Sequence, residues 1–215
     1  MGLKAAIFDL DGVVVDTVPI HFKAWKQMFE EYGKTFTFDD YKQKVDGIPR
    51  RDGARAILTD LTDDELKKAA NLKQTYFIKN LEKEEIPQFT TTIRLITNLL
   101  NDNIKCAVVS SSKNCPTILK RIGLFDKLGS VISGDDITRG KPDPQIFLMA
   151  AEQLGANPSE CIAFEDAVLG VESAKNAKMH CIGIDRYSHP ERLALADIVV
   201  SDLGEIDLAK VKALF

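Results

Sequence analysis

Short apolar runs recur along the chain, and most are separated by segments with the periodicity of amphipathic helices. The runs predict buried strands at 5–8, 106–110, 130–133, 161–164, 181–184 and 197–200. Between two of them, residues 145–154 carry apolar side chains at helical spacing and end at Gly155, a typical helix stop. Strands that alternate with helices, without hairpin signals, predict an α/β fold built on a doubly wound parallel sheet.

The segment after the first apolar run has a different pattern, because it shows helical periodicity but no strand. Apolar residues at i, i+3, i+4 and i+7 predict a helix over 25–32. The sequence TDDE at 62–65 is a capping box and predicts the start of a long charged helix that extends to about Glu84. We therefore expect two units, an inserted all-helical cap and an α/β core: 17–88, and 1–16 with 89–215.

The composition and charge of the chain limit which partners and which cell compartment we expect for this protein. The chain has 215 residues, 45% of them hydrophobic, and a formal net charge of −4, which gives no bulk signal for nucleic acid. No apolar run approaches the ~18 residues of a membrane span. The N-terminal sequence MGLKAAIFDLDG has an aspartate at position 9, which is too early for a signal peptide. We therefore expect a cytoplasmic protein with no nucleic-acid or membrane partner and, because no heptad pattern is present, a monomer.

The four cysteines form no CxxC pair, and most lie in or beside strand-like runs. We therefore expect reduced core residues at these positions: Cys106, Cys115, Cys161 and Cys181.

Acidic residues follow two of the predicted strands. Asp9 and Asp11 end the first run, where alternation along a strand points i and i+2 the same way, and Gly12 permits a sharp turn. Glu165 and Asp166 end another run. Either pair alone could be a solvated turn with a capping aspartate. Together they favour an all-oxygen site that suits Mg²⁺.

Two further turns carry groups that suit a phosphate. The serines at 110–112 follow an apolar run, and Pro116 begins a predicted helix whose N-terminal amides would bind an anion. Lys141 precedes Pro142, which we expect to open another helix. A lysine fixed there would offset both clustered carboxylates and a phosphate, although each turn alone is a common feature of α/β proteins.

In chain order these motifs read DxD, Ser, Lys-Pro and Glu-Asp, and their order and spacing resemble the haloacid dehalogenase-like superfamily over the whole chain. The resemblance implies a Rossmann-like core with an inserted cap and phosphoryl transfer through an aspartyl phosphate. It implies Asp9 as nucleophile and Asp11 as general acid and base. It also implies a Mg²⁺ site and a site for the transferring phosphoryl group: the Asp9 carboxylate, the Asp11 backbone carbonyl, Glu165 and Asp166 for the metal; Ser110, Ser111 and Lys141 for the phosphoryl group.

The cap sequence resembles the β-phosphoglucomutase family within that superfamily. The resemblance lies in HFKAW at 21–25, DGIPRRDG at 46–53, the lysine of the capping-box helix, and SSSKN at 110–114. It implies these substrate contacts: His21, Trp25, Gly47, Ile48, Arg50, Lys73, Ser112 and Asn114. The residues alone also allow simpler interpretations: core packing for His21 and Trp25, a solvated basic face for Arg50, and a surface helix for Lys73.

The resemblance therefore implies a small phosphorylated sugar as substrate and leaves two reactions open. A β-phosphoglucomutase interconverts β-glucose 1-phosphate and glucose 6-phosphate through glucose 1,6-bisphosphate, and needs a second phosphate site, which Arg50 and Lys73 would supply. A phosphatase acting on sugar phosphates or pyrophosphate needs only the first site. Pro49, where the mutases carry serine, keeps that alternative open. A non-catalytic phosphate-binding protein is disfavoured because every catalytic position holds a competent residue.

Overall fold

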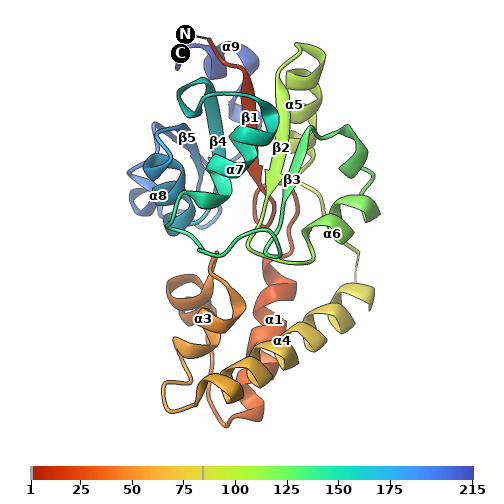
Figure 1. Ribbon diagram of the computed structural model, residues 1–215, viewed down its shortest axis with the longest axis vertical. Helices are drawn as coiled ribbons and strands as arrows, with labels where there is room; N and C mark the ends of the chain where they lie inside the picture. Colours follow the sequence, from red (N-terminus) through yellow and green to blue (C-terminus); the bar gives the residue numbers. More distant parts are fainter. Residues whose placement is uncertain (1, 84) are drawn as a thin grey trace. The chain divides into compact units, whose positions relative to one another are not determined.

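A six-stranded parallel sheet forms the centre of the α/β part of the chain (Figure 1). The computed structural model describes residues 2–83 and 85–215. The strands are β1 (Ala5–Asp9), β2 (Lys105–Val109), β3 (Ser130–Ile132), β4 (Cys161–Glu165), β5 (His180–Ile184) and β6 (Ile198–Val200). Each predicted run is a strand, so the predicted parallel sheet is confirmed.

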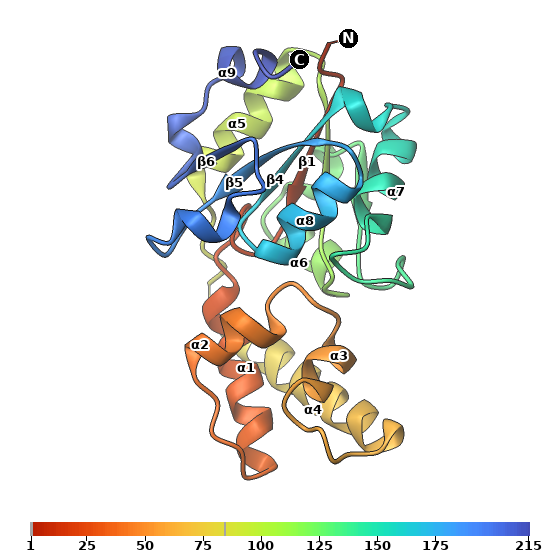
Figure 2. The same cartoon turned by 90° about the vertical axis from the view of Figure 1, so that its left-hand side faces the viewer.

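Helices cover both faces of this sheet, which explains why the strands read as continuous apolar runs. Helices α7 (Gln145–Leu154) and α8 (Val168–Asn176) lie on one face, and α5 (Thr90–Asn101) lies on the other (Figure 2). The core on the α7 side contains Ile7, Phe147 and Val171, all with 1% exposure or less. The remaining elements of this part are α6 (Cys115–Arg121), α9 (Leu208–Lys212), and 3-10 turns at Phe125–Lys127, Pro158–Glu160, Pro190–Leu193 and Leu203–Glu205.

The strand order, β3-β2-β1-β4-β5-β6, places β1 at the point where the winding of the sheet reverses. Chain order runs outward from β1 through β2 and β3 on one side, and through β4, β5 and β6 on the other. In doubly wound sheets, ligands bind at the carboxyl ends of the strands next to such a reversal. The ends of β1, β2 and β4 are therefore the place to look for a site.

The chain divides into two compact units. One contains the residues up to Asp16 together with Gln88–Phe215, and the other is Thr17–Pro87. The second unit is helical and contains α1 (Val18–Glu31), α2 (Phe38–Asp40), a π-helical turn (Tyr41–Val45), α3 (Arg50–Arg55) and α4 (Asp63–Lys83).

The helical unit has a core of its own, formed by the apolar faces of α1, α3 and α4. Met28, Phe29 and Leu66 are fully buried in it. The predicted capping box is present at the start of α4, where the Thr62 amide donates to Glu65 Oε2 at 2.8 Å. Glu84, the predicted end of that helix, lies outside the described residues.

The prediction that Pro142 opens a helix is wrong. Helix α7 begins at Gln145, and its first amide donates to Asp143 Oδ1 at 2.9 Å. Asp143 precedes Pro144, and a residue before proline is pushed away from helical dihedrals. The helix therefore starts only after the second proline.

All four cysteines are free and buried, as predicted. Among the described helices, none combines the length and the apolar character that a membrane crossing requires.

Candidate active site

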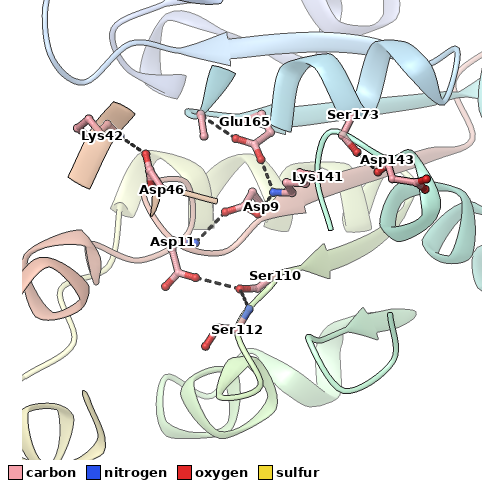
Figure 3. A network of polar contacts seen from close by, with 11 residues as sticks. Asp9, Asp11, Lys42, Asp46, Ser110, Ser112, Lys141, Asp143, Glu165 and Ser173 are labelled. Atoms are coloured by element: carbon pink, nitrogen blue, oxygen red, sulfur yellow. Dashed lines mark hydrogen bonds and ion pairs between the residues drawn. The ribbon is translucent and has the colours of Figure 1, made fainter. Parts of the chain in front are cut away.

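A buried ion-pair network lies at the carboxyl ends of β1 and β4 (Figure 3). Asp9, the last residue of β1, is 6% exposed, and Lys141 Nζ donates to its Oδ1 at 2.5 Å. The same Nζ donates to Oε1 of Glu165, the last residue of β4. Glu165 is fully buried and accepts a second hydrogen bond from the Ala167 amide at 2.8 Å. One lysine thus bridges carboxylates from two neighbouring strand ends.

Burial dominates the electrostatics of this network. It raises the pKa of the Asp9 carboxyl well above its ordinary value, and the Lys141 ammonium opposes that rise. Burial by itself lowers the pKa of Lys141, but Asp9 and Glu165 outweigh it, so the pKa of the lysine is raised. Removing charges from water costs several kcal/mol per ion. Clusters of buried charged side chains, which carry this desolvation cost, are found preferentially at functional sites.

Asp11 lies in the turn after β1, and its carboxylate is held by a serine from the neighbouring strand. Ser110, directly after β2 and 2% exposed, donates to Asp11 Oδ2 at 2.9 Å. The Asp11 amide donates to Asp9 Oδ2 at 3.0 Å. Because β1 ends at Asp9, strand alternation does not place Asp11 as predicted. The turn after the strand positions Asp11 instead, and a β-bridge between Asp11 and Val15 closes that turn.

Glycine is required in that turn. Gly12 has a φ of 88°, and a Cβ at this position would lie 2.3 Å from Asp166 Oδ2. A larger residue would therefore clash with Asp166 and strain the backbone. The missing side chain lets the Asp166 carboxylate lie against the turn that carries Asp11.

The predicted ligands have the chemistry that a magnesium ion requires. Carboxylates of Asp9, Glu165 and Asp166 and the backbone carbonyl of Asp11 would supply only oxygen, which Mg²⁺ prefers. Within the described part of the chain, no three His, Cys, Asp or Glu side chains form a ready ligand cage. Mg²⁺ does not need one, because it binds through one or two carboxylates and retains water molecules.

The serine loop after β2 is compact and tied to the same network. The Ser112 amide donates to Ser110 Oγ at 3.0 Å, and the Asn114 amide donates to Ser112 Oγ at 3.2 Å. The Ser111 carbonyl lies so close to Gly134 that a Cβ there would approach it to 2.2 Å. The predicted serines therefore form one closely packed, hydrogen-bonded turn before α6.

In the helical unit, Lys73 is 1% exposed, so the interpretation of this residue as part of a solvated helix surface is wrong. Its Nζ lies 2.8 Å from His21 Nδ1. It also lies 5.1 Å from the ring centroid of Trp25 and 4.9 Å from that of Phe77. His21 and Phe77 stack at 4.1 Å. The structure thus brings two of the predicted substrate-contacting residues, His21 and Trp25, next to the buried ammonium group of a third, Lys73.

The remaining predicted residues of this unit form the loop that leads into α3. Gly47 has a φ of 75°, Ile48 is half-buried, and the half-buried Arg50 is the first residue of α3. The neighbouring Arg51 is exposed and pairs with Asp63 at 2.6 Å. Of the two adjacent arginines, Arg51 therefore belongs to the solvated basic face, and Arg50 is the more enclosed.

The family model for "Haloacid dehalogenase-like hydrolase" matches residues 6–184, which is most of the chain. The chain belongs to this haloacid dehalogenase-like family. The match begins in β1 and ends with β5, so Asp9, Ser110 and Glu165 all lie inside it.

The relatives of this haloacid dehalogenase-like enzyme include both mutases and phosphatases. It is 34% identical to "Beta-phosphoglucomutase" of Bacillus subtilis (strain 168), over 96% of this chain and 92% of the relative. It is 32% identical to "Phosphorylated carbohydrates phosphatase" of Thermotoga maritima, over 86% of this chain and 83% of the relative. A crystal structure of β-phosphoglucomutase from Clostridium difficile superimposes with a TM-score of 0.89 at 28% identity, covering 98% of this chain and 96% of the other.

Two residues of these networks are not among the sequence predictions. Phe77 lies four positions after Lys73 on α4, so helical spacing alone offered a signal for it. Arg186 follows β5 and donates to the carbonyl of Gly12 at 3.2 Å. It comes directly after a polar residue at a predicted strand end, but no local pattern links it to a turn so far away in the sequence.

Proposed function

We propose that this enzyme transfers phosphoryl groups through a phosphate ester on Asp9, and that its reaction is that of a β-phosphoglucomutase. The observation that supports the chemistry most directly is the position of Asp9: buried at the end of β1, paired with Lys141, and next to an Asp11 carboxylate held by Ser110. Phosphoryl transfer depends on positioning and on charge stabilisation more than on covalent chemistry. This arrangement supplies both.

In the proposed reaction an Asp9 carboxylate oxygen bonds to phosphorus as the bond from phosphorus to the sugar oxygen breaks. Asp11 donates a proton to the departing oxygen and later takes one from the acceptor hydroxyl. Lys141 favours the ionised form of Asp9 and, with Ser110 and Ser111, would hold the transferring group. The donors for Mg²⁺ would be Asp9, Glu165, Asp166 and the Asp11 carbonyl; when bound, the ion offsets the charge of the phosphate.

A mutase also requires a site for the phosphate that is not being transferred. Arg50 and Lys73 are the proposed groups, and His21, Trp25, Gly47, Ile48, Ser112 and Asn114 are the proposed contacts to the sugar. A buried ammonium group attracts an anion more strongly than an exposed one, because water screens it less. The similarity to the Bacillus mutase extends over the helical unit, which carries all of these residues except Ser112 and Asn114, and this supports the proposed substrate class.

A sugar-phosphate phosphatase is the second candidate. The similarity to the Thermotoga phosphatase supports it. Pro49 supports it as well, because a proline at this position of the loop before α3 offers a substrate neither a hydroxyl nor a backbone N–H. Asp9 would act in the same way, and water would replace the sugar as the final acceptor.

One assay separates the two candidates. The enzyme is given β-glucose 1-phosphate, Mg²⁺ and a trace of glucose 1,6-bisphosphate, and glucose 6-phosphate and free phosphate are followed separately. A mutase forms glucose 6-phosphate with little free phosphate, and the opposite result contradicts the mutase proposal. Asp9→Asn is expected to abolish both products, and surviving turnover would refute the aspartyl-phosphate mechanism.

Two lysines of α4 provide a matched pair of variants for the second phosphate site. Lys73→Met removes the buried ammonium but keeps the apolar stem. We expect mutase turnover to fall about tenfold to a hundredfold, because that is the range of effect for losing a hydrogen bond to a charged group. Lys79→Met changes an exposed lysine of the same helix and should stay close to wild type. Equal activity of the two variants would place the second phosphate site elsewhere.

A further inference from the structure

Arg186 connects the turn that carries Asp11 to two other segments of the α/β unit. It follows β5, and its side chain is 14% exposed. Its Nε donates to the Gly12 carbonyl at 3.2 Å, and its Nη1 donates to Asp202 Oδ2 at 3.0 Å. Its guanidinium carbon lies 3.7 Å from the ring centroid of Phe89. The side chain therefore contacts three segments that are far apart in the sequence.

Two of these segments lie where the chain leaves the α/β unit and returns to it. Phe89 closely follows the return, and its amide donates to the Val14 carbonyl at 3.0 Å. Asp16 is the last residue before the helical unit; burial raises the pKa of its carboxyl, and Arg186 opposes that rise, so the guanidinium charge acts on this residue too. Arg186 thus braces the turn from Gly12 to Asp16 against the returning segment.

Two of the three nitrogens of the Arg186 guanidinium donate the hydrogen bonds given above, and the third does not. Its Nη2 is buried and has no hydrogen-bond acceptor among the residues that the structure describes. A buried donor left without an acceptor costs free energy. An apolar side chain over Phe89 would avoid this cost but would lose the bond to Gly12. Only a polar side chain at this position can make the bond to the Gly12 carbonyl.

We propose that Arg186 is a positioning residue for Asp11, holding the backbone turn so that the acid carboxylate faces the leaving oxygen. Two of the bonds around Asp11 act from the sheet side, through Ser110 and Asp9. Arg186 fixes the following peptide from the β5 side, through Gly12. This inference rests on the proposed function, because it assigns Arg186 to the proton transfer of that reaction.

Two aryl phosphates of nearly equal size test the proposal. Phenyl phosphate has a basic leaving group that needs a proton from Asp11, whereas the nitrophenolate of p-nitrophenyl phosphate leaves with little help. Arg186→Met keeps an apolar contact over Phe89 but cannot bond to Gly12. We expect the variant's turnover of phenyl phosphate to fall by about tenfold more than its turnover of p-nitrophenyl phosphate. That difference is part of the roughly 10²–10⁴-fold acceleration that general acid catalysis supplies. Equal losses on both substrates would overturn the proposal.

A second measurement on the hexose phosphate makes the result independent of aryl substrates. Arg186→Met should lower kcat and leave KM nearly unchanged, and Arg186→Lys, which keeps a donor near Gly12, should recover part of the loss. A loss confined to KM would overturn the proposal. Arg192→Met, an exposed arginine of the same connection, is the matched control. A wild-type enzyme that turns over neither kind of substrate contradicts the proposed function instead.

Discussion

At the scale of single residues, the central feature is one lysine that serves two buried carboxylates. Lys141, Asp9 and Glu165 are all at most 6% exposed, so water screens the charges little. The lysine compensates both acids at once, and each acid lies at the end of a strand that is paired on both sides. Removing the lysine would leave two negative charges facing each other inside the protein.

We expect Lys141→Met to be inactive and less stable than wild type by about 3–5 kcal/mol near neutral pH, the usual cost of leaving a buried charge unpaired. Burial already raises the pKa of Asp9 with the lysine present, and the variant raises it further. A carboxyl whose pKa is higher in the folded state favours folding at low pH, so the destabilisation should grow as pH rises above the unfolded pKa of about 3.9. Urea unfolding at pH 5 and pH 8 measures this.

Lys113→Met is the matched control, because Lys113 pairs with Asp135 on the surface, where both side chains are at least 50% exposed. An exposed pair contributes about 0–1 kcal/mol. A Lys141 variant that loses no more stability than this control, or the same amount at both pH values, would show that the network is not the buried pair described.

At the scale of elements, the first turn of α8 is shaped by the carboxylate it covers. A Cβ at Gly170 would lie 1.7 Å from Glu165 Oε1. Alanine in place of glycine ordinarily stabilises a helix interior by about 1 kcal/mol. Here the overlap outweighs that gain, because Glu165 is held on its other side by Lys141 and by the Ala167 amide.

We therefore expect Gly170→Ala to destabilise the protein by about 1–3 kcal/mol, the usual cost of overpacking a tight core. It should also reduce turnover, because Glu165 must move. Glu172→Ala, at a half-exposed position of the same helix, is the control. Thermal unfolding and the phosphate assay measure both variants, and a Gly170→Ala variant as stable and active as wild type would contradict the close approach.

The strands were predictable from the sequence, and the contacts between distant elements were not. Runs such as 5–8 and 161–164 are apolar throughout because the sheet is covered on both faces, so periodicity alone identifies them. Burial of Lys73 depends on the packing of α1 against α4, which its own charged helix does not reveal. Arg186 meets Gly12 only because β5 and β1 share a sheet. Local patterns contain no information about such contacts.

At the scale of the whole molecule, each unit carries its own probe of unfolding. The single tryptophan, Trp25, is 3% exposed in the helical unit. All four cysteines lie in the α/β unit and are buried. Burial raises the pKa of Cys106 to about 12. Since an unfolded cysteine has a pKa of about 8.5 and only the thiolate reacts, labelling at pH 8 detects opening of the α/β unit.

We expect tryptophan fluorescence to change at a lower urea concentration than thiol labelling. The helical unit is the smaller of the two, and small units bury a smaller fraction of their surface on folding. The chain passes between the units twice, after Asp16 and before Gln88, so the helical unit can unfold while the sheet of the α/β unit stays paired. Coincident transitions would mean instead that the two units unfold as one cooperative system. Thiol labelling that precedes the fluorescence change would reverse the order of stability and show that the inserted helices fold independently of the sheet.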